Sequence, residues 1–162
     1  MSYFGKYFLT GPDAQKAADW LCSHNVQQPE GTTVYTCLLN RAGRVEADLT
    51  FSVLKGDTGS TPANPAFEGT GFYITVIEDN RFRCNLIDNS HQMGLLSIQG
   101  PHSRELLQAL TPADLSDTAF PFSTHRMIDF AGHPVRAIRL TFVGELGWEL
   151  HVPNDGILDV YR

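Results

Sequence analysis

Two stretches of the chain share one order of elements: a strand-like run, a Gly-Pro pair and a helix-like run. The first is FLTGPDAQKAADWL, with the pair at Gly11-Pro12, and the second is LSIQGPHSRELLQAL, with the pair at Gly100-Pro101. Their helical apolar positions also align: Ala17 with Leu106, Ala18 with Leu107, and Leu21 with Leu110. This internal repeat favours two related modules. The alternative is that two common strand–turn–helix connections resemble each other by coincidence.

A hairpin pattern follows each of these stretches. β-Branched and aromatic residues fill both arms, and turn residues such as Asn and Gly separate them. The arms are expected at 32–39 and 45–54 in the first module, and at 125–130 and 134–142 in the second. The fold class is therefore expected to be α+β, with antiparallel sheets and helices, divided into modules 1–90 and 91–162.

The remaining elements follow from local composition. Further strands are expected at 3–9, 72–77, 83–87, 94–98 and 148–152. The first helix is expected to end near His24-Asn25, and the second to place all three of its leucines on one face. Residues 55–71 are rich in Gly, Pro, Thr and Ser and are expected to form a loop, and Asn154 is expected to cap a last helix.

Composition excludes several functions. The chain has 12 Lys+Arg against 18 Asp+Glu, a formal net charge of −6, and an acidic chain without a basic stripe is a poor nucleic-acid binder. No long apolar run indicates a membrane span. Cys22, Cys37 and Cys84 are odd in number and form no C-x-x-C pair, so reduced, buried thiols are expected, as in the cytosol or the mitochondrial matrix.

The motifs of several enzyme classes are absent. The sequence has no G-x-G-x-x-G fingerprint, no phosphate-binding loop and no G-x-S-x-G elbow. The histidines show no H-E-x-x-H spacing, so no metal site is expected. His151 shares a strand face with Glu149, and both are expected at the surface or at the rim of a site.

Asp48 is the first candidate functional residue. It lies within the strand-like run VEADLTF, on the same side as Glu46, and an aspartate in a β-rich strand breaks the local preference. A carboxylate held in a cleft is one interpretation, and a solvated position on an edge strand is the other.

Glu149 is the second candidate. It ends the run GELGWE, in which Gly144 and Gly147 permit backbone conformations that other residues avoid. A carboxylate beside Trp148, on a strand entering a pocket, could grip a flat ring rich in N–H groups by two parallel hydrogen bonds. A charged outward position alternating with a core aromatic is the alternative.

The runs SIQGP, FPFSTH and RLTFVGELGWELHVP resemble the aminomethyltransferase (glycine-cleavage T-protein) family. With SYFGKYFLTGPDAQKAADWL and TVYTCLLNRAGRVEADLT, they are most similar to the T-protein-like domain of sarcosine-oxidising flavoenzymes. The resemblance covers nearly the whole chain except 55–71. It implies a cloverleaf of three modules around a folate, of which this chain supplies the first and part of the second.

This resemblance implies a function and cofactors. In such flavoenzymes, FAD in a separate N-terminal domain oxidises the N-methyl group, and tetrahydrofolate in this domain captures the one-carbon unit as 5,10-methylenetetrahydrofolate. The implied partners are folate and the FAD domain of the same parent chain, with no nucleic acid and no membrane. The implied location is the mitochondrial matrix, although the first residues, MSYFGKYFLTG, do not read as a targeting peptide.

The resemblance also implies site residues, where positions of this chain match the family's motifs. The catalytic aspartate falls on Asp48, and the pterin-gripping glutamate falls on Glu149, beside Trp148. Related oxidases often have a tyrosine seven residues before that glutamate. Phe142 occupies the position here, so a hydroxyl contact would be lost and only packing would remain.

Two departures limit what the resemblance implies. Relatives carry roughly one extra helix where this chain passes directly through 75–80. A C-terminal remainder, with an arginine near the folate tail, is also absent, and both ends of the chain look internal. The alternatives are therefore a non-catalytic scaffold, or the equivalent domain of a dimethylglycine-oxidising enzyme or of an aminomethyltransferase.

Overall fold

The structure is a computed structural model that describes residues 2–55, 66–71 and 82–162. It divides into two compact units. The first unit is Phe4–Ser90, and the second is His91–Arg162 together with the first residues of the chain. The main division lies between Ser90 and His91. The expected strand at 72–77 and the shortened segment at 75–80 lie outside the described residues.

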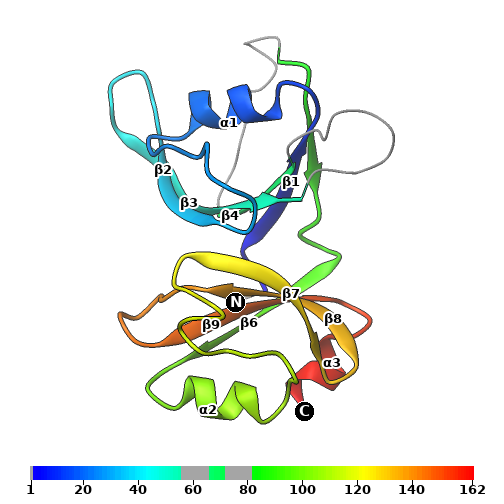
Figure 1. The fold of residues 1–162 in the computed structure, drawn as a ribbon. Coiled ribbons are helices and arrows are strands. Elements are labelled where there is room, and N and C mark those ends of the chain that lie inside the picture. The colour runs from blue at the N-terminus through cyan, green and yellow to red at the C-terminus, as the bar shows by residue number, and fades with distance from the viewer. Residues whose placement is uncertain (1, 56–65, 72–81) are drawn as a thin grey trace. The chain divides into compact units, whose positions relative to one another are not determined.

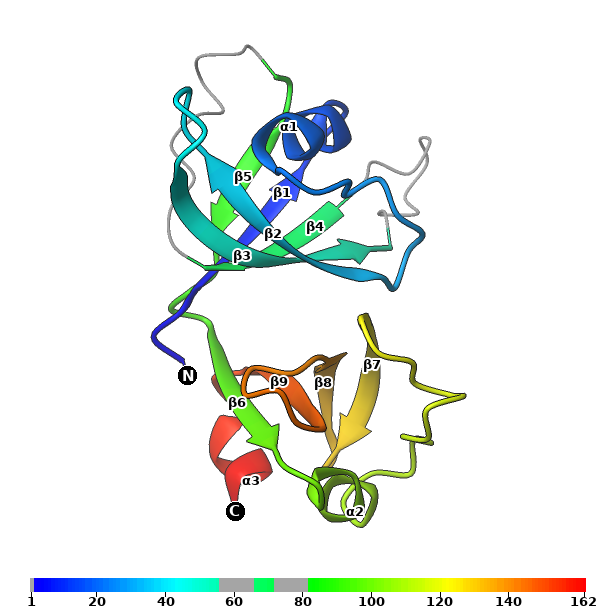
Figure 2. The same cartoon turned by 90° about the vertical axis from the view of Figure 1, so that its left-hand side faces the viewer.

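The first unit is a five-stranded antiparallel sheet with one helix (Figure 1). Its strands lie in the order β2-β3-β4-β1-β5, and α1 lies across one face of the sheet (Figure 2). Leu9, Leu49 and Phe51 pack under the small residues of α1 to form the core. The elements are β1 Gly5–Thr10, α1 Ala14–Leu21, β2 Thr33–Leu39, β3 Val45–Leu54, β4 Ala66–Gly71 and β5 Asn85–Asp88.

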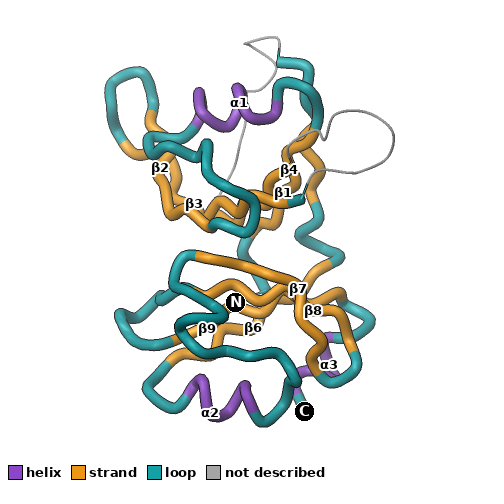
Figure 3. The backbone as a smooth tube through the Cα atoms, in the orientation of Figure 1, coloured by secondary structure: helices purple, strands orange, loops and turns teal. Residues whose placement is uncertain are grey.

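The second unit is a four-stranded antiparallel sheet in the order β6-β9-β8-β7. Leu107 of α2 and Val160 of α3 pack with Trp148 and Leu150 of β9 into one core. The long loop between α2 and β7 (Figure 3) adds Phe120 to that core. The elements are β6 Met93–Gln99, α2 Ser103–Gln108, β7 Thr124–Phe130, β8 His133–Arg139, β9 Gly147–Pro153 and α3 Ile157–Tyr161.

The two units repeat one topology. In each, the strand before the first helix pairs with the strand after the hairpin, which pairs in turn with the second hairpin arm. The first unit adds β5 on the outer side of β1. The Gly-Pro turns also match, since Gly11 has φ +116° and Gly100 has φ +124°. The carbonyls of both glycines accept a 3.1 Å hydrogen bond from the first helical N–H. The α+β class with antiparallel sheets is confirmed.

The expected hairpins are present. β2 pairs with β3, and β7 pairs with β8. Ala131 and Gly132 join the second pair, and both have positive φ, as a two-residue type I′ turn requires. β8 ends at Arg139, earlier than expected, so Phe142 lies in the following loop.

The expectation that 55–71 forms only a loop was wrong, because β4 spans Ala66–Gly71. Its sequence, AFEGTG, has little strand propensity. However, β4 lies between β1 and β3 and pairs with both. Pairing with a strand on each side stabilises β4 despite its low strand propensity. The local sequence does not indicate this pairing.

Three helical expectations were also wrong. α1 ends at Leu21, since the Cys22 backbone is extended. In the short α2, Leu107 is buried and Leu106 is more than half exposed, because only one side of a helix of this length meets the sheet. Leu110 lies beyond the end of α2 and is also more than half exposed. Asn154 does not cap α3, because Gly156 is the N-cap residue and the Asn154 side chain donates to the His91 carbonyl.

The cysteines form no disulfide in the described part of the chain. Cys22 is buried, as expected, and desolvation raises the pKa of its thiol to about 12. Cys37 and Cys84 are only partly buried. None of the helices in the described part combines the length and the apolar character needed to cross a bilayer.

Gly11 and Gly100 occupy equivalent turns with similar φ, so substitutions at the two positions can be compared directly. A Cβ at position 11 would lie 2.8 Å from the Arg83 carbonyl oxygen and 2.9 Å from the Cys84 Cα, whereas at position 100 the nearest atom is 3.7 Å away. We expect Gly100→Ala to lower the free energy of unfolding by about 1 to 2 kcal/mol through positive φ alone. Gly11→Ala should lower it by roughly 1 to 3 kcal/mol more, because backbone atoms must also shift. Urea unfolding followed by circular dichroism measures both, and equal losses would contradict the close approach at Gly11.

Candidate functional site

Each sheet has one face covered by the helices of its own unit and one face that we call helix-free. Side chains alternate along a strand, so the β3 residues that pack under α1, such as Leu49 and Phe51, place Glu46 and Asp48 on the opposite face. On β9, Trp148 and Leu150 belong to the helix-side core, so Glu149 lies on the helix-free face. Both candidate carboxylates therefore occupy the same kind of face in repeated units.

Asp48 is exposed and makes one well-defined contact. The hydroxyl of Tyr35 donates to its Oδ2 at 2.8 Å, which is its one hydrogen bond to the residues that the structure describes. This bond to a carboxylate raises the pKa of Tyr35, because it favours the protonated phenol. The interpretation of an edge position was wrong, since β3 lies between β2 and β4, but solvent exposure of this face was anticipated.

Glu46 has the same orientation as Asp48 but a different partner. The side-chain amide of Asn40 donates to Glu46 Oε1 at 2.6 Å. Asn40 also accepts backbone N–H bonds from Ala42 and Arg44, so it organises the turn between β2 and β3. Glu46 thus supports the hairpin turn, whereas the side chain of Asp48 bonds to Tyr35 instead.

Glu149 is buried, which corrects its expected place at a surface or rim. Its strand is central in the sheet, where Ser97 of β6 and Ile138 of β8 lie directly beside it. His151, also buried, lies two residues along the same face, with its Nε2 3.8 Å from Glu149 Oε2. The two side chains therefore form a polar patch on the helix-free face.

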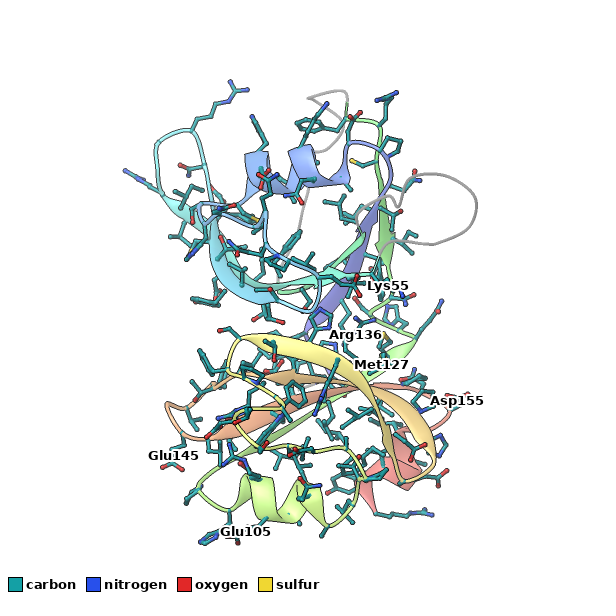
Figure 4. All side chains as sticks on the ribbon, viewed as in Figure 1. Lys55, Glu105, Met127, Arg136, Glu145 and Asp155 are labelled. Atoms are coloured by element: carbon teal, nitrogen blue, oxygen red, sulfur yellow. The ribbon has the colours of Figure 1, made fainter. Side chains whose placement is uncertain are left out.

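The strand register adds further neighbours to the pair of Glu149 and His151. Arg136 of β8 lies beside His151 in the register, and Met127 of β7 lies beside Arg136. Figure 4 labels both Met127 and Arg136, and it shows Glu105 projecting from α2 on the far side of that helix from the sheet. A basic, an acidic and an imidazole group therefore occupy neighbouring positions on one face of this sheet.

Trp148 holds β9 in place from the other face. Its side chain is fully buried, with the ring edge against Phe120. The guanidinium carbons of Arg139 and Arg104 lie 4.6 Å and 5.7 Å from the indole centroid. Such cation–π contacts strengthen when they are desolvated. A direct contact of Trp148 with a ligand stays a prediction, and the structure gives it a supporting position behind Glu149.

Asp117 joins the two arginines. It accepts from Arg139 Nη1 at 2.9 Å and also from Arg104. The hydrogen bond from Arg139 contributes most to lowering the pKa of Asp117, with the charge of Arg104 acting in the same direction. The sequence analysis missed this cluster, because the three residues are far apart in the chain and no motif joins them.

The loop that precedes β9 is fixed to the start of α2. The Gly100 N–H and the Ser103 hydroxyl both donate to the Leu146 carbonyl, at 2.7 and 3.1 Å. Gly144 has φ +84°, and a Cβ at Gly147 would overlap the side chain of Gln99. The structure therefore explains why glycine occupies both positions of the GELG run. Phe142, on this loop, is 64 % exposed, and its assignment as a ligand contact stays a prediction.

Tyr35 was also missed, although the sequence held a usable signal. In the register of the hairpin, Cys37 lies opposite Asp48 and Tyr35 lies opposite Thr50, so Tyr35 and Asp48 are diagonal neighbours on one face. Among the described residues, no group of three or more His, Cys, Asp and Glu side chains could hold a metal ion.

The chain belongs to the family described as the GCVT N-terminal domain, whose model matches residues 1–162. The fold agrees. The glycine cleavage system aminomethyltransferase T from Bartonella henselae superposes with a TM-score of 0.69, covering 98 % of this chain and 43 % of that one at 17 % identity.

Among named relatives, the mitochondrial sarcosine dehydrogenase of Mus musculus is 55 % identical over the whole chain. The mitochondrial dimethylglycine dehydrogenase of Rattus norvegicus is 34 % identical, again over the whole chain. The chain spans 19 % of the length of each. The match to the mouse protein extends over 177 residues, more than the 162 of this chain, so that protein carries additional residues inside the matched region.

The arginine cluster behind Trp148 generates a prediction. Arg139→Met keeps the aliphatic bulk but removes the cation, so we expect the free energy of unfolding to fall by about 1 to 2 kcal/mol. In a Trp20→Phe background, where Trp148 is the only tryptophan, its fluorescence emission should also shift. Arg44→Met, at an exposed turn position, is the control. If the two methionine variants behaved alike, the cluster would not support β9.

Proposed function

We propose that this chain is the folate-binding, one-carbon-transfer part of a sarcosine dehydrogenase that uses FAD in another domain. The identity to the mouse enzyme over the whole chain supports the parent. One observation supports the assignment of the two acids to a folate site: Asp48 and Glu149 both lie on the helix-free sheet faces of repeated units. The mitochondrial matrix is the proposed location, because the relatives are named mitochondrial.

Glu149 is proposed to orient the folate. An ionised carboxylate accepts two hydrogen bonds at once, which matches the amino-pyrimidine edge of a pterin. Burial strengthens such bonds, since the dielectric is lower than in water. Ser97, opposite Glu149 in the register, and His151 add polar groups to the same face. Arg139 and Trp148 would act indirectly, by fixing β9 from behind.

Asp48 is proposed to handle the proton. Oxidation of sarcosine, supplied by the flavin elsewhere, yields an iminium whose one-carbon unit must reach tetrahydrofolate before water hydrolyses it to formaldehyde. One folate amine attacks the iminium carbon and loses its proton to the Asp48 carboxylate. The bond between that carbon and the glycine nitrogen then breaks as the nitrogen takes up a proton, so glycine departs. The second folate amine attacks the same carbon and loses its own proton, which gives 5,10-methylenetetrahydrofolate.

Asp48 lies in the first unit and Glu149 in the second, so each role is proposed for its residue separately. FAD has no proposed site in this chain, whose sequence lacks a dinucleotide fingerprint. An assay of the full-length parent enzyme with sarcosine and with dimethylglycine would show which of the two dehydrogenases contains this chain.

A non-catalytic scaffold is the second candidate. It is favoured by the additional residues inside the matched region of the mouse protein, because a folate pocket built with them would be incomplete here. Tetrahydrofolate titrated into this chain should then bind much more weakly than to a longer version that restores those residues and the C-terminal remainder. Equal affinities would exclude an incomplete pocket.

Substitution in the full-length parent tests the two roles. Asp48→Asn should slow formation of methylenetetrahydrofolate by about 100-fold or more, and formaldehyde should rise in its place, because general-base catalysis is lost. Flavin reduction by sarcosine should be unchanged. Glu149→Gln should instead weaken tetrahydrofolate binding by about 10- to 100-fold, since charge-assisted bonds are lost.

Product analysis with rapid-reaction kinetics measures the first effect, and equilibrium titration measures the second. Glu46→Gln is the matched control, because it removes a carboxylate from the same face of β3 and leaves Asp48 intact. Normal transfer in Asp48→Asn would refute the role of that aspartate, and unchanged affinity in Glu149→Gln would refute pterin recognition.

A further inference from the structure

The contact between Tyr35 and Asp48 joins two strands on one face. Tyr35 lies on β2, at the edge of the sheet, and Asp48 lies on the neighbouring interior strand β3. Their diagonal positions in the antiparallel register bring a long aromatic side chain within reach of a short acid. The resulting hydrogen bond, 2.8 Å from Oη to Oδ2, has the usual length of an O–H···O hydrogen bond.

This bond restricts a carboxylate that would otherwise rotate. The last torsion of an aspartate side chain is broad, so an exposed carboxylate has no fixed orientation of its own. With Oδ2 occupied by the phenol, Oδ1 is the oxygen left to accept a proton. Since the bond to Asp48 raises the pKa of Tyr35, the phenol remains a donor throughout the neutral range.

The partner of Glu46 shows that the arrangement is specific to Asp48. Both acids lie on the helix-free face, yet Glu46 is held by Asn40 of the turn and Asp48 by Tyr35. An amide that organises a turn has a structural role. A phenol that is 63 % exposed, and therefore buries little apolar area, contributes little to the core.

We infer that Tyr35 is a positioning residue for proton transfer: it binds Asp48 Oδ2 and so presents Oδ1 to the folate amine. This inference rests on the proposed function, because it needs Asp48 to be the proton acceptor. Tyr35 does not itself exchange the proton. Its hydroxyl acts through Asp48, so its effect must disappear when Asp48 cannot accept a proton.

Tyr35→Phe in the full-length parent is the test, since it removes the hydroxyl and keeps the ring. Formation of methylenetetrahydrofolate should slow about tenfold, the equivalent of one hydrogen bond to a charged group. Flavin reduction by sarcosine and the Kd of tetrahydrofolate should be unchanged. In the double variant with Asp48→Asn, transfer should be no slower than in Asp48→Asn alone. Tyr161→Phe, an exposed tyrosine in the second unit, is the control.

The outcomes separate this inference from the proposed function. If Asp48→Asn transfers normally, the role of Asp48 fails and the inference fails with it. If Asp48→Asn is slow but Tyr35→Phe transfers normally, or if the double variant shows additive losses, only the positioning role is overturned. NMR of ring-labelled tyrosine adds a direct readout: Asp48→Asn should lower the pKa of Tyr35, and an unchanged value would refute the contact.

Discussion

The architecture depends on one pairing, between the strand that precedes the first helix of each unit and the strand that follows its hairpin. β1 pairs with β4, and β6 pairs with β9. Each pairing closes an antiparallel sheet on which the helices cover a single face. The apolar side chains of β3 and β9 collect under those helices, so alternation alone sends Asp48 and Glu149 to the other face. The location of both acids is thus a consequence of the same topology used twice.

The two acids differ in how the fold supports them. Asp48 is exposed, and a neighbouring strand orients it through one phenol. Glu149 is buried in a central strand beside His151, and the cluster of Trp148 with two arginines secures that strand from behind. An exposed, oriented base suits proton transfer, whereas a buried, immobile carboxylate suits recognition of a flat ring. The proposed division of labour follows from this difference in support.

Much of the fold was predictable because its signals are local. The hairpin of β2 and β3, the two Gly-Pro turns and the alternation along β9 can all be read from short stretches. β4 could not be predicted, since its stability comes from pairing on both sides. The exposure of Leu106 and the burial of Glu149 likewise depend on what packs against each position. For the same reason, the contacts of Asp117 with two arginines became evident only from the packing, whereas the hairpin pattern already held a signal for Tyr35.

A folate analogue tests the central claim most directly. Tetrahydrofolate without its 2-amino group cannot offer a full amino-pyrimidine edge to a carboxylate. Equilibrium titration of the full-length parent should show that removing this group weakens binding to the native protein by about tenfold or more, and barely changes binding to Glu149→Gln. If the analogue weakened binding equally in both proteins, Glu149 would not grip the pterin, and the assignment of the site would be wrong.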